Sequence, residues 1–287
     1  MSPKTPPRRH ELTDAQWERL RPLLPPQKPH TGRPSKDHRT VINGMLWVMR
    51  TGAPWEDLPE RYGSYKTVSS RFYRWRKAGI WDRILAEVQK DADTKGQVEW
   101  EIHFADSSIV RAHQHAAGAE RSGGQGDPKP GEPASGPESE ALGRSQGGFS
   151  TKIHVRCEGK GKPVVFELTP GEAHESTMFE TLMEGGAIKR AGRGRPRRLP
   201  HRIAADKAYS SKRIRGYLAK RGIGITIPRK SNEKHRGRFD KEAYRKRNRV
   251  ERLINRLKQY RRIATRYDKR AANYKAFLFI AAILLWL

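Results

Sequence analysis

Apolar residues in the first third of the chain recur every three to four positions, which is the spacing of one face of a helix. Capping residues and Gly or Pro stops divide this region into short helices, expected at residues 13–24, 37–52, 64–79 and 80–90. Short helices joined by turns form a helix-turn-helix type of arrangement. The sequence therefore predicts an all-α region over residues 12–95.

The third of these helices combines an apolar stripe with dense positive charge. Val68, Phe72 and Trp75 recur at i, i+4 and i+7 and can form its buried face. If this helix enters a major groove as a recognition helix, its cations would contact DNA; they are Arg71, Arg74, Arg76 and Lys77. The alternative is a small helical bundle whose basic face is only solvated.

Beyond residue 96 the pattern changes to that of strands separated by helices. Strands are expected in the segments WEIHFAD, TKIHVRCE, KPVVFELTP, HRIAAD and GIGITIPR. Helices are expected in HESTMFETLME, SSKRIRGYLAK and a basic segment over residues 241–262. The C-terminal AFLFIAAILLWL is shorter than the roughly 20 residues of a membrane span, so we expect a closing core helix. This order predicts an α/β domain with a mixed sheet over residues 96–287.

Two segments lack the apolar residues that a packed element needs. Residues 118–148 are dominated by Gly, Pro, Ser and Glu, which predicts a mobile insertion after the first strand. Residues 1–11 are Pro-rich and basic, which predicts a disordered tail.

The charge balance points to a polyanionic partner. The chain has 287 residues with 59 Lys and Arg against 31 Asp and Glu, giving a net charge of +28. A membrane surface is the competing polyanion, but no basic amphipathic helix has a broad apolar face, so we expect DNA and no membrane. A single cysteine, Cys157, and the absence of an apolar signal segment at the N-terminus favour a reducing cytoplasm.

Three acidic residues are candidates for chemistry. Asp106 and Asp206 each follow a short apolar run, and the carboxyl ends of strands are where open sheets carry functional groups. Either residue alone is more often a turn former or a helix cap. Glu251 is the only acidic residue between Tyr244 and Tyr267, and local pairing with Arg247 is the simpler explanation for it.

The spacing around Glu251 resembles a known signature. Tyr244, Arg247, Glu251 and Lys258 match the Y-(2)-R-(3)-E-(6)-K pattern of DDE transposases from bacterial insertion sequences without a gap. On a helix these four side chains lie within roughly 60° of one another. The segments LTDAQWERLRPLLP and VINGMLWVMRTGAPWEDLP resemble the N-terminal domain of the insertion-sequence-five group.

This resemblance implies a ribonuclease H-like catalytic domain with Asp106, Asp206 and Glu251 as its catalytic, metal-binding triad. It also implies that Tyr244, Arg247 and Lys258 contact transposon-end DNA. Carboxylates suit Mg2+, with Mn2+ as a substitute. Two such ions about 3.5–4 Å apart can promote hydrolysis of a phosphodiester and transfer of its strand.

The expected protein is thus a nucleoid-associated transposase, working as a homodimer on double-stranded DNA. Its DNA would be the paired inverted-repeat ends of its own insertion sequence and a target. Two alternatives are a catalytically silent DNA-binding relative and a general nuclease of the same fold.

Histidines raise a rival metal site. His103, His113, His115 and His154 invite zinc, but no Cys or acidic residue stands beside them at structural-zinc spacing. The segment HQHAAGA instead resembles the one that follows the first aspartate in insertion-sequence-five relatives. It would place His113 and His115 along the DNA path, with their role open.

Overall fold

The helical region contains the four expected helices. In this computed structural model, which describes residues 10–27, 36–117, 140–145, 147–233 and 239–287, they are α1 (Asp14–Leu20), α2 (His38–Thr51), α3 (Tyr65–Lys77) and α4 (Ile80–Thr94). Single 3-10 turns join them: η1 (Arg21–Leu23), η2 (Trp55–Asp57) and η3 (Glu60–Tyr62).

Local side-chain bonds fix where these helices begin and end. Thr13 and Gln16 form a reciprocal capping box at the start of α1, and the Asp37 carboxylate accepts from the backbone of Thr40 at the start of α2. Gly52 ends α2 with a φ of 75°, a conformation that costs glycine little. These boundaries were predictable because they depend only on neighbouring residues.

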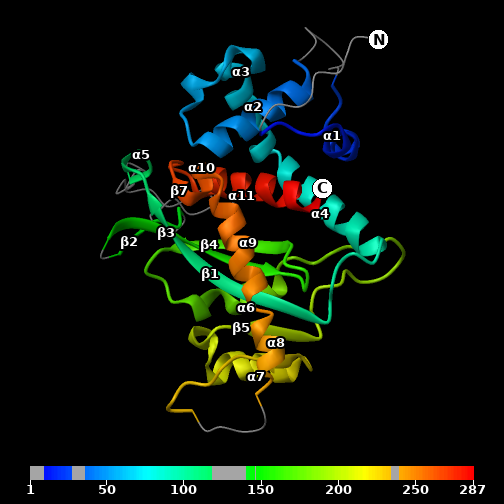
Figure 1. The fold of residues 1–287 in the computed structure, drawn as a ribbon, viewed down its shortest axis with the longest axis vertical. Coiled ribbons are helices and arrows are strands. Elements are labelled where there is room, and N and C mark those ends of the chain that lie inside the picture. The colour runs from blue at the N-terminus through cyan, green and yellow to red at the C-terminus, as the bar shows by residue number, and fades with distance from the viewer. Residues whose placement is uncertain (1–9, 28–35, 118–139, 146, 234–238) are drawn as a thin grey trace, which may run out of the picture.

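The predicted C-terminal core helix is confirmed, and it joins the two halves of the chain. α11 (Ala271–Trp286) lies between the helical region and the sheet, as its red ribbon shows in Figure 1. Phe277 stacks on Phe72 of α3 with ring centroids 4.5 Å apart, and Trp286 donates to the Pro163 carbonyl at 2.8 Å. One apolar core therefore runs through both regions, whose division at residue 95 stays a prediction.

The sheet has the strand order of a ribonuclease H-like fold. Its main path runs β4 (Pro163–Pro170), β3 (Gly148–Cys157), β1 (Ile102–Ala112), β5 (Arg202–Ala205) and β6 (Gly224–Thr226). β3 runs antiparallel to both of its neighbours, β4 and β1, whereas β1, β5 and β6 are parallel. Short strands β2 (Gly143–Ser145) and β7 (Thr265–Arg266) extend the sheet beside β3 and β1.

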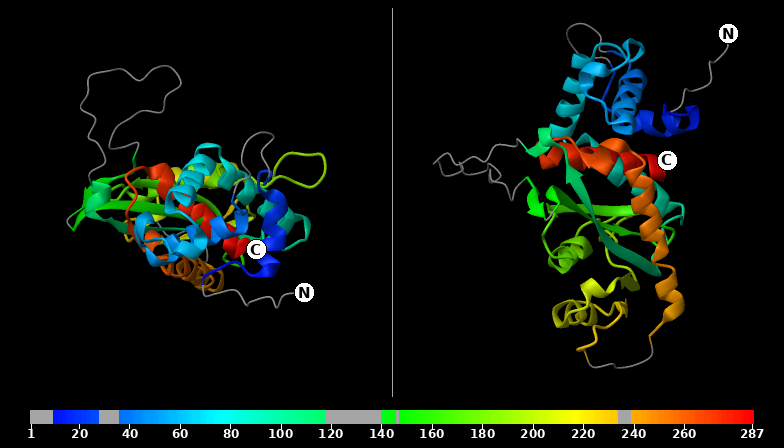
Figure 2. Two further views of the ribbon diagram at one scale, coloured as in Figure 1. Left: turned by 90° about the horizontal axis from the view of Figure 1, so that it is seen from above. Right: turned by 60° about the vertical axis from the view of Figure 1, so that its left-hand side comes forward.

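Helices cover both faces of this sheet, as the two views of Figure 2 show. One face carries α9 (Asn248–Lys258) and α11, and the other carries α6 (Phe179–Glu184) and α7 (Lys212–Lys220). Shorter helices complete the chain: α5 (Gln114–Ala117), η4 (Glu175–Met178), η5 (Lys207–Tyr209), α8 (Lys241–Arg245) and α10 (Arg261–Ala264). None of the helices within the described ranges is long and apolar enough to cross a membrane.

Three expectations about local structure need correction. The predicted helix over 241–262 is divided into α8, α9 and α10 by turns. The predicted mobile insertion over 118–148 includes strand β2, because residues 143–145 pair with β3; residues 118–139 and 146 lie outside the described residues. Of the predicted tail, residues 1–9 also lie outside them, whereas Glu11 accepts a hydrogen bond from Tyr62 at 2.9 Å.

Candidate active site

Asp106 and Asp206 come together at the edge of the parallel part of the sheet. The last parallel pair of β1 and β5 is Ala105 with Ala205, so the two aspartates follow it side by side. Asp206 directly follows β5 as predicted, and its carboxylate accepts from the backbone of Ala208 at 2.9 Å.

Asp106 does not end its strand, contrary to the expectation from the sequence. β1 continues to Ala112 because its other edge stays paired with β3 as far as Arg111. The two aspartates are therefore neighbours where β1 loses β5 as a partner, and only one of them sits at a true strand end.

A third carboxylate, which the sequence analysis missed, completes this cluster. Oxygen atoms of Asp106, Glu175 and Asp206 all lie within 4.8 Å of one another. Glu175 opens η4, the turn that leads from β4 towards α6. Its segment was recognised only as a helix, and no strand end or spacing marked it as a site residue.

The cluster is approached from both faces of the sheet. Side chains alternate along a strand, and Phe104 packs in the core beneath α9 and α11, whereas Ala105 packs in the core beneath α6 and α7. Asp106 therefore faces the α9 side, while Glu175 arrives from the α6 side. They meet in the gap that opens beyond the last β1–β5 pair.

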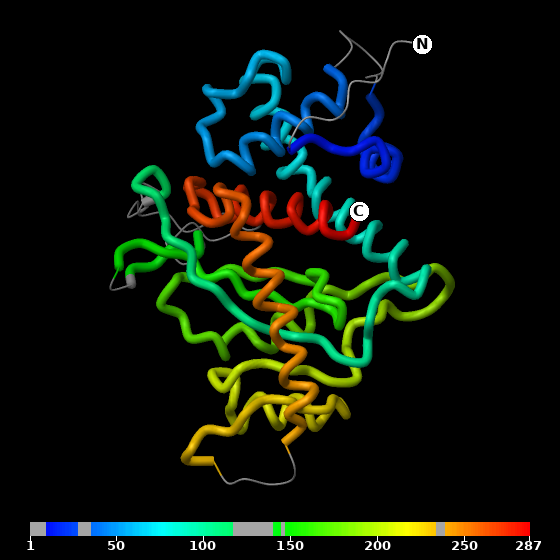
Figure 3. The backbone as a smooth tube through the Cα atoms, viewed as in Figure 1, coloured from blue at the N-terminus to red at the C-terminus, as the bar shows by residue number. Residues whose placement is uncertain are grey.

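Glu251 lies close to this cluster but outside it. Its side chain is 49% exposed on α9, and the Arg247 guanidinium donates to it and, at 3.0 Å, to the Asp106 carboxylate. One guanidinium thus bridges two of the three acidic residues expected in the triad. In Figure 3 the orange α8–α9 segment crosses in front of β1.

The electrostatics of the cluster favour a cation. Burial raises the pKa of Asp106 to about 6, against the lowering influence of Arg247 and the Ser107 amide, and the charges of Asp206 and Glu175 raise it further. Burial would lower the pKa of Arg247, but the charges of Asp106 and Glu251 outweigh it and raise that pKa. The carboxyls repel one another and would be relieved by a positive ion.

The other members of the Y-(2)-R-(3)-E-(6)-K pattern lie along the same segment. The Tyr244 ring lies 5.4 Å from the Phe239 ring and beneath the Arg247 guanidinium. Lys258 donates to the Ile109 carbonyl of β1 at 3.2 Å, and burial lowers its pKa. These side chains form a row beside the carboxylate cluster.

The cations expected on the recognition helix divide into two groups. Arg71 is only 4% exposed and donates to the Lys36 carbonyl at 2.9 Å, so it fixes α3 to the segment before α2. Its predicted place on a DNA-binding surface is therefore corrected: α2 covers it. Arg74 and Lys77 are exposed, and Arg76 is partly buried.

The histidines do not form a metal site among the residues described. His103 is buried against Trp100, and His154 bonds to the Thr169 hydroxyl at 2.8 Å. His113 and His115 lie with ring centroids 4.6 Å apart, next to the Tyr267 ring. His103, His154 and the His113–His115 pair thus lie in three separate places.

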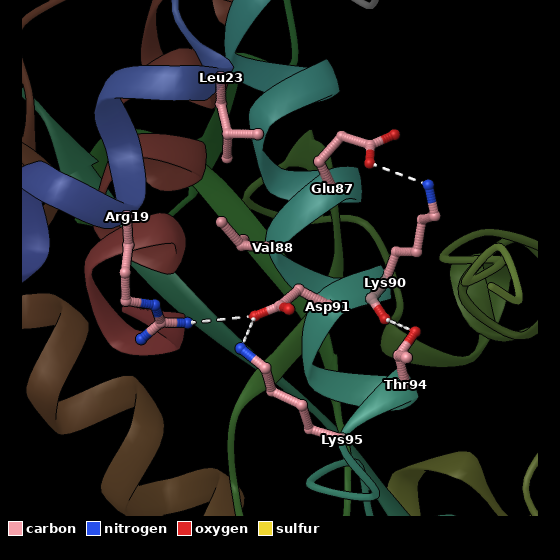
Figure 4. Close-up of a pocket in the computed structure, with 8 residues that line it drawn as sticks. All are labelled: Arg19, Leu23, Glu87, Val88, Lys90, Asp91, Thr94 and Lys95. Atoms are coloured by element: carbon pink, nitrogen blue, oxygen red, sulfur yellow. Dashed lines mark hydrogen bonds and ion pairs between the residues drawn. The ribbon is translucent and has the colours of Figure 1, made fainter.

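A hollow of about 480 Å³ between α1 and α4 is separate from the cluster (Figure 4). Asp91, in its wall, pairs with Lys95 at 2.7 Å and Arg19 at 3.8 Å. Both carboxylates of the lining are thus paired with cations of the lining, since Glu87 also pairs with Lys90, and none of the lining residues belongs to the carboxylate cluster.

A ribonuclease H-like sheet with clustered carboxylates at the end of its parallel strands is typical of metal-dependent enzymes that cut or join phosphodiesters. Residues 101–286 match the family model described as "Transposase DDE domain", and residues 12–85 match "Putative transposase of IS4/5 family". The chain belongs to the DDE transposase family of bacterial insertion sequences.

Curated relatives agree with this family. The uncharacterized protein y4sN of Sinorhizobium fredii is 44% identical over 39% of this chain and 86% of its own length. The putative transposase for insertion sequence element IS6501 of Brucella ovis is 28% identical over 48% of this chain and 99% of its own. That for IS402 of Burkholderia cepacia is 30% identical over 47% of this chain and 62% of its own.

Solved structures are more distant. The Mos1 strand transfer complex matches 70% of this chain and 60% of that chain with 14% identity and a TM-score of 0.25. The Mos1 paired-end complex with left transposon end matches 81% and 80% with 12% identity and the same TM-score. The fold assignment rests on the strand order above and not on these likenesses.

Proposed function

We propose that this protein is the DNA transposase of an insertion sequence, which binds the terminal inverted repeats of that element and catalyses phosphodiester hydrolysis and strand transfer. The observation that carries the proposal is the position of Asp106 and Asp206, which both directly follow the last residue pair of β1 and β5, Ala105 and Ala205. Their carboxylate oxygens lie within 4.8 Å of each other. Hard oxygen ligands so arranged suit a divalent cation.

The residues present fit a metal ion. Glu175 Oε2 is buried and has no hydrogen-bond partner among the described residues, so a cation would satisfy an oxygen that is otherwise costly to bury. Asp106 and Asp206 would hold Mg2+, or Mn2+ in its place, and Glu251 would complete the set. Such ions supply an activated water or hydroxyl and neutralise the leaving oxygen.

Arg247, Tyr244 and Lys258 would act on the DNA. Arg247 is bonded to Asp106 and Glu251, and it would exchange these carboxylates for a phosphate when a cation binds them. Tyr244 would position the end nucleotide, and Lys258 would hold a phosphate from beside β1. The cationic row thus orients the scissile strand while the carboxylates bind the metal.

The remaining basic surface would bind double-stranded DNA more broadly. Arg74, Arg76 and Lys77 on α3 are candidates for contacts with the inverted repeats, and the net charge of +28 suits both ends and target. Joining two ends requires two copies of the site, so a homodimer on paired ends is part of the proposal. Its place of action would be the cytoplasm, at the nucleoid.

The test uses the purified protein with DNA that carries the inverted repeats flanking its gene, and with random DNA, in Mg2+ and in Ca2+. Asp106→Asn, Asp206→Asn and Glu251→Gln should each lower the rate of strand cleavage more than about 100-fold. Loss of a residue that only hydrogen-bonds to a metal ligand lowers activity by about 10- to 100-fold, so a larger loss indicates a ligand itself. Gel-shift affinity for the ends should stay within about twofold.

Glu242→Gln is the matched control, because its carboxylate is exposed on α8 and pairs only with Lys246. Retained cleavage in any of the three variants would remove that residue from the site. Cutting without sequence preference would support a general nuclease. Specific binding without cutting by the unchanged protein would support the catalytically silent DNA-binding relative.

A further inference from the structure

Glu175 is placed by contacts that have no need of a metal. Its turn, η4, follows the end of β4, and His174 caps that turn by accepting from the backbone of Ser176 at 3.2 Å. Arg213 of α7 donates to the Ser176 carbonyl at 2.5 Å and pairs with Glu180 at 2.7 Å. The backbone that carries Glu175 is thus clamped to α7.

The position of its carboxylate is costly without a ligand. Oε2 of Glu175 is buried with no hydrogen-bond partner among the residues described, while other oxygens of the cluster lie within 4.8 Å. A buried carboxylate oxygen close to two other carboxylates lacks both solvation and a counter-charge. A divalent cation supplies what Glu175 lacks.

Tyr209 gives a second, independent indication of a ligand. Its side chain is 0% exposed, and apart from an interaction with the neighbouring Ser107 hydroxyl its own hydroxyl has no hydrogen-bond partner within the described part of the chain. Burial raises the pKa of Tyr209, and the nearby charges of Glu175, Asp106 and Asp206 raise it further. A fully buried hydroxyl beside three carboxylates would be satisfied by a water molecule held on a bound ion.

Arg247 separates the role of Glu251 from that of Glu175. Glu251 is bonded to this guanidinium on α9 and is half exposed, whereas the oxygens of Glu175 already share the space of the two aspartates. Metal binding at Asp106, Glu175 and Asp206 requires Arg247 to give up only its bond to the Asp106 carboxylate. Recruitment of Glu251 requires that Arg247 release it.

We infer that Glu175 is a metal ligand and that a first divalent cation binds to Asp106, Glu175 and Asp206 before DNA arrives and before Glu251 takes part. This inference rests on the proposed function and adds to it an order of assembly. Glu251 would join only when DNA phosphate draws Arg247 away from the carboxylates.

The experiment is a Mn2+ titration of the full-length protein without DNA, in which electron paramagnetic resonance measures the free ion. Glu175→Gln should weaken binding of the first ion at least about tenfold, as should Asp106→Asn and Asp206→Asn. Glu175→Asp should recover part of the affinity because it restores the carboxylate. Glu251→Gln should stay within about threefold of the unchanged protein.

Glu172→Gln is the matched control, since Glu172 is exposed three residues upstream of Glu175 and outside the cluster. A Glu175→Gln protein that binds Mn2+ as the Glu172→Gln protein does would overturn the role of Glu175. A loss with Glu251→Gln as large as that with Glu175→Gln would overturn the order of assembly. Unchanged binding in both aspartate variants would instead remove the metal site on which the proposed function depends.

A second measurement decides the matter if Glu175→Gln fails to fold. Fe2+ with ascorbate, added to the unchanged protein without DNA, generates radicals that cut the backbone beside the bound ion. Cuts at residues 106, 206 and 174–176, with none near 251, would support the inference. Cuts at 106 and 206 without any at 174–176 would refute it.

Discussion

Replacing Arg247 by Gln should tighten the binding of a divalent cation in the absence of DNA. The Arg247 guanidinium donates a hydrogen bond to the Asp106 carboxylate at 3.0 Å. The Arg247 side chain is 18% exposed and the Asp106 side chain 13% exposed. A hydrogen bond to a charged group contributes about 1.5–3 kcal/mol. The partner on the other side, Glu251, is half exposed, so that contact contributes only tenths of a kcal/mol.

At the lower end of this range for Asp106, an ion that enters the Arg247→Gln protein no longer has to displace about 1.5 kcal/mol of pairing. That free energy corresponds to slightly more than a tenfold gain in affinity. The assay is Mn2+ titration by calorimetry at pH 8, where Asp106 with its pKa of about 6 is ionised. Arg245→Gln is the control, because it removes the same charge from an exposed position on α8. Unchanged or weaker Mn2+ binding by the Arg247→Gln protein would refute the reasoning.

Three further predictions concern pH, DNA binding and stability. Burial raises the pKa of Asp106 to about 6, so a proton competes with the metal ion for this carboxylate below that pH. The apparent Mn2+ affinity should therefore fall about tenfold per pH unit below pH 6 and level off above pH 7. An affinity that is constant across this range would contradict the role of Asp106 as a metal ligand. Arg74→Gln should weaken binding to end DNA and reduce the slope of log affinity against log salt by about 1. Arg71→Gln, which removes a buried internal bond, should lower the denaturant midpoint and leave that slope unchanged; a changed slope would return Arg71 to the DNA surface.

Features fixed by neighbouring residues could be predicted from the sequence. The caps at Thr13 and Asp37 set helix starts through bonds that span three residues. The step from apolar run to aspartate located Asp206 at the end of β5. These predictions hold in the folded protein because each feature depends on residues close to it in the sequence.

Features that depend on distant partners could not be predicted in this way. The apolar run before Asp106 suggested a strand end at this residue, but pairing with β3 carries β1 six residues further. Glu175 reaches the aspartates only because η4 packs against α7, a contact that no spacing encodes. Arg71 follows the helical period of its neighbours, yet its burial depends on the segment before α2.

The position of α11 also affects the order in which the chain can become stable. This helix supplies part of the surface on which α3 and α4 pack, and it is made of residues 271–286, so the ribosome must reach these residues before those helices are fully covered. Until then the apolar sides of α3 and α4 face water, and an isolated N-terminal fragment lacks the ring of Phe277 that closes over Phe72. The stability of the helical region is thereby coupled to synthesis of the region that carries the sheet and the carboxylate cluster.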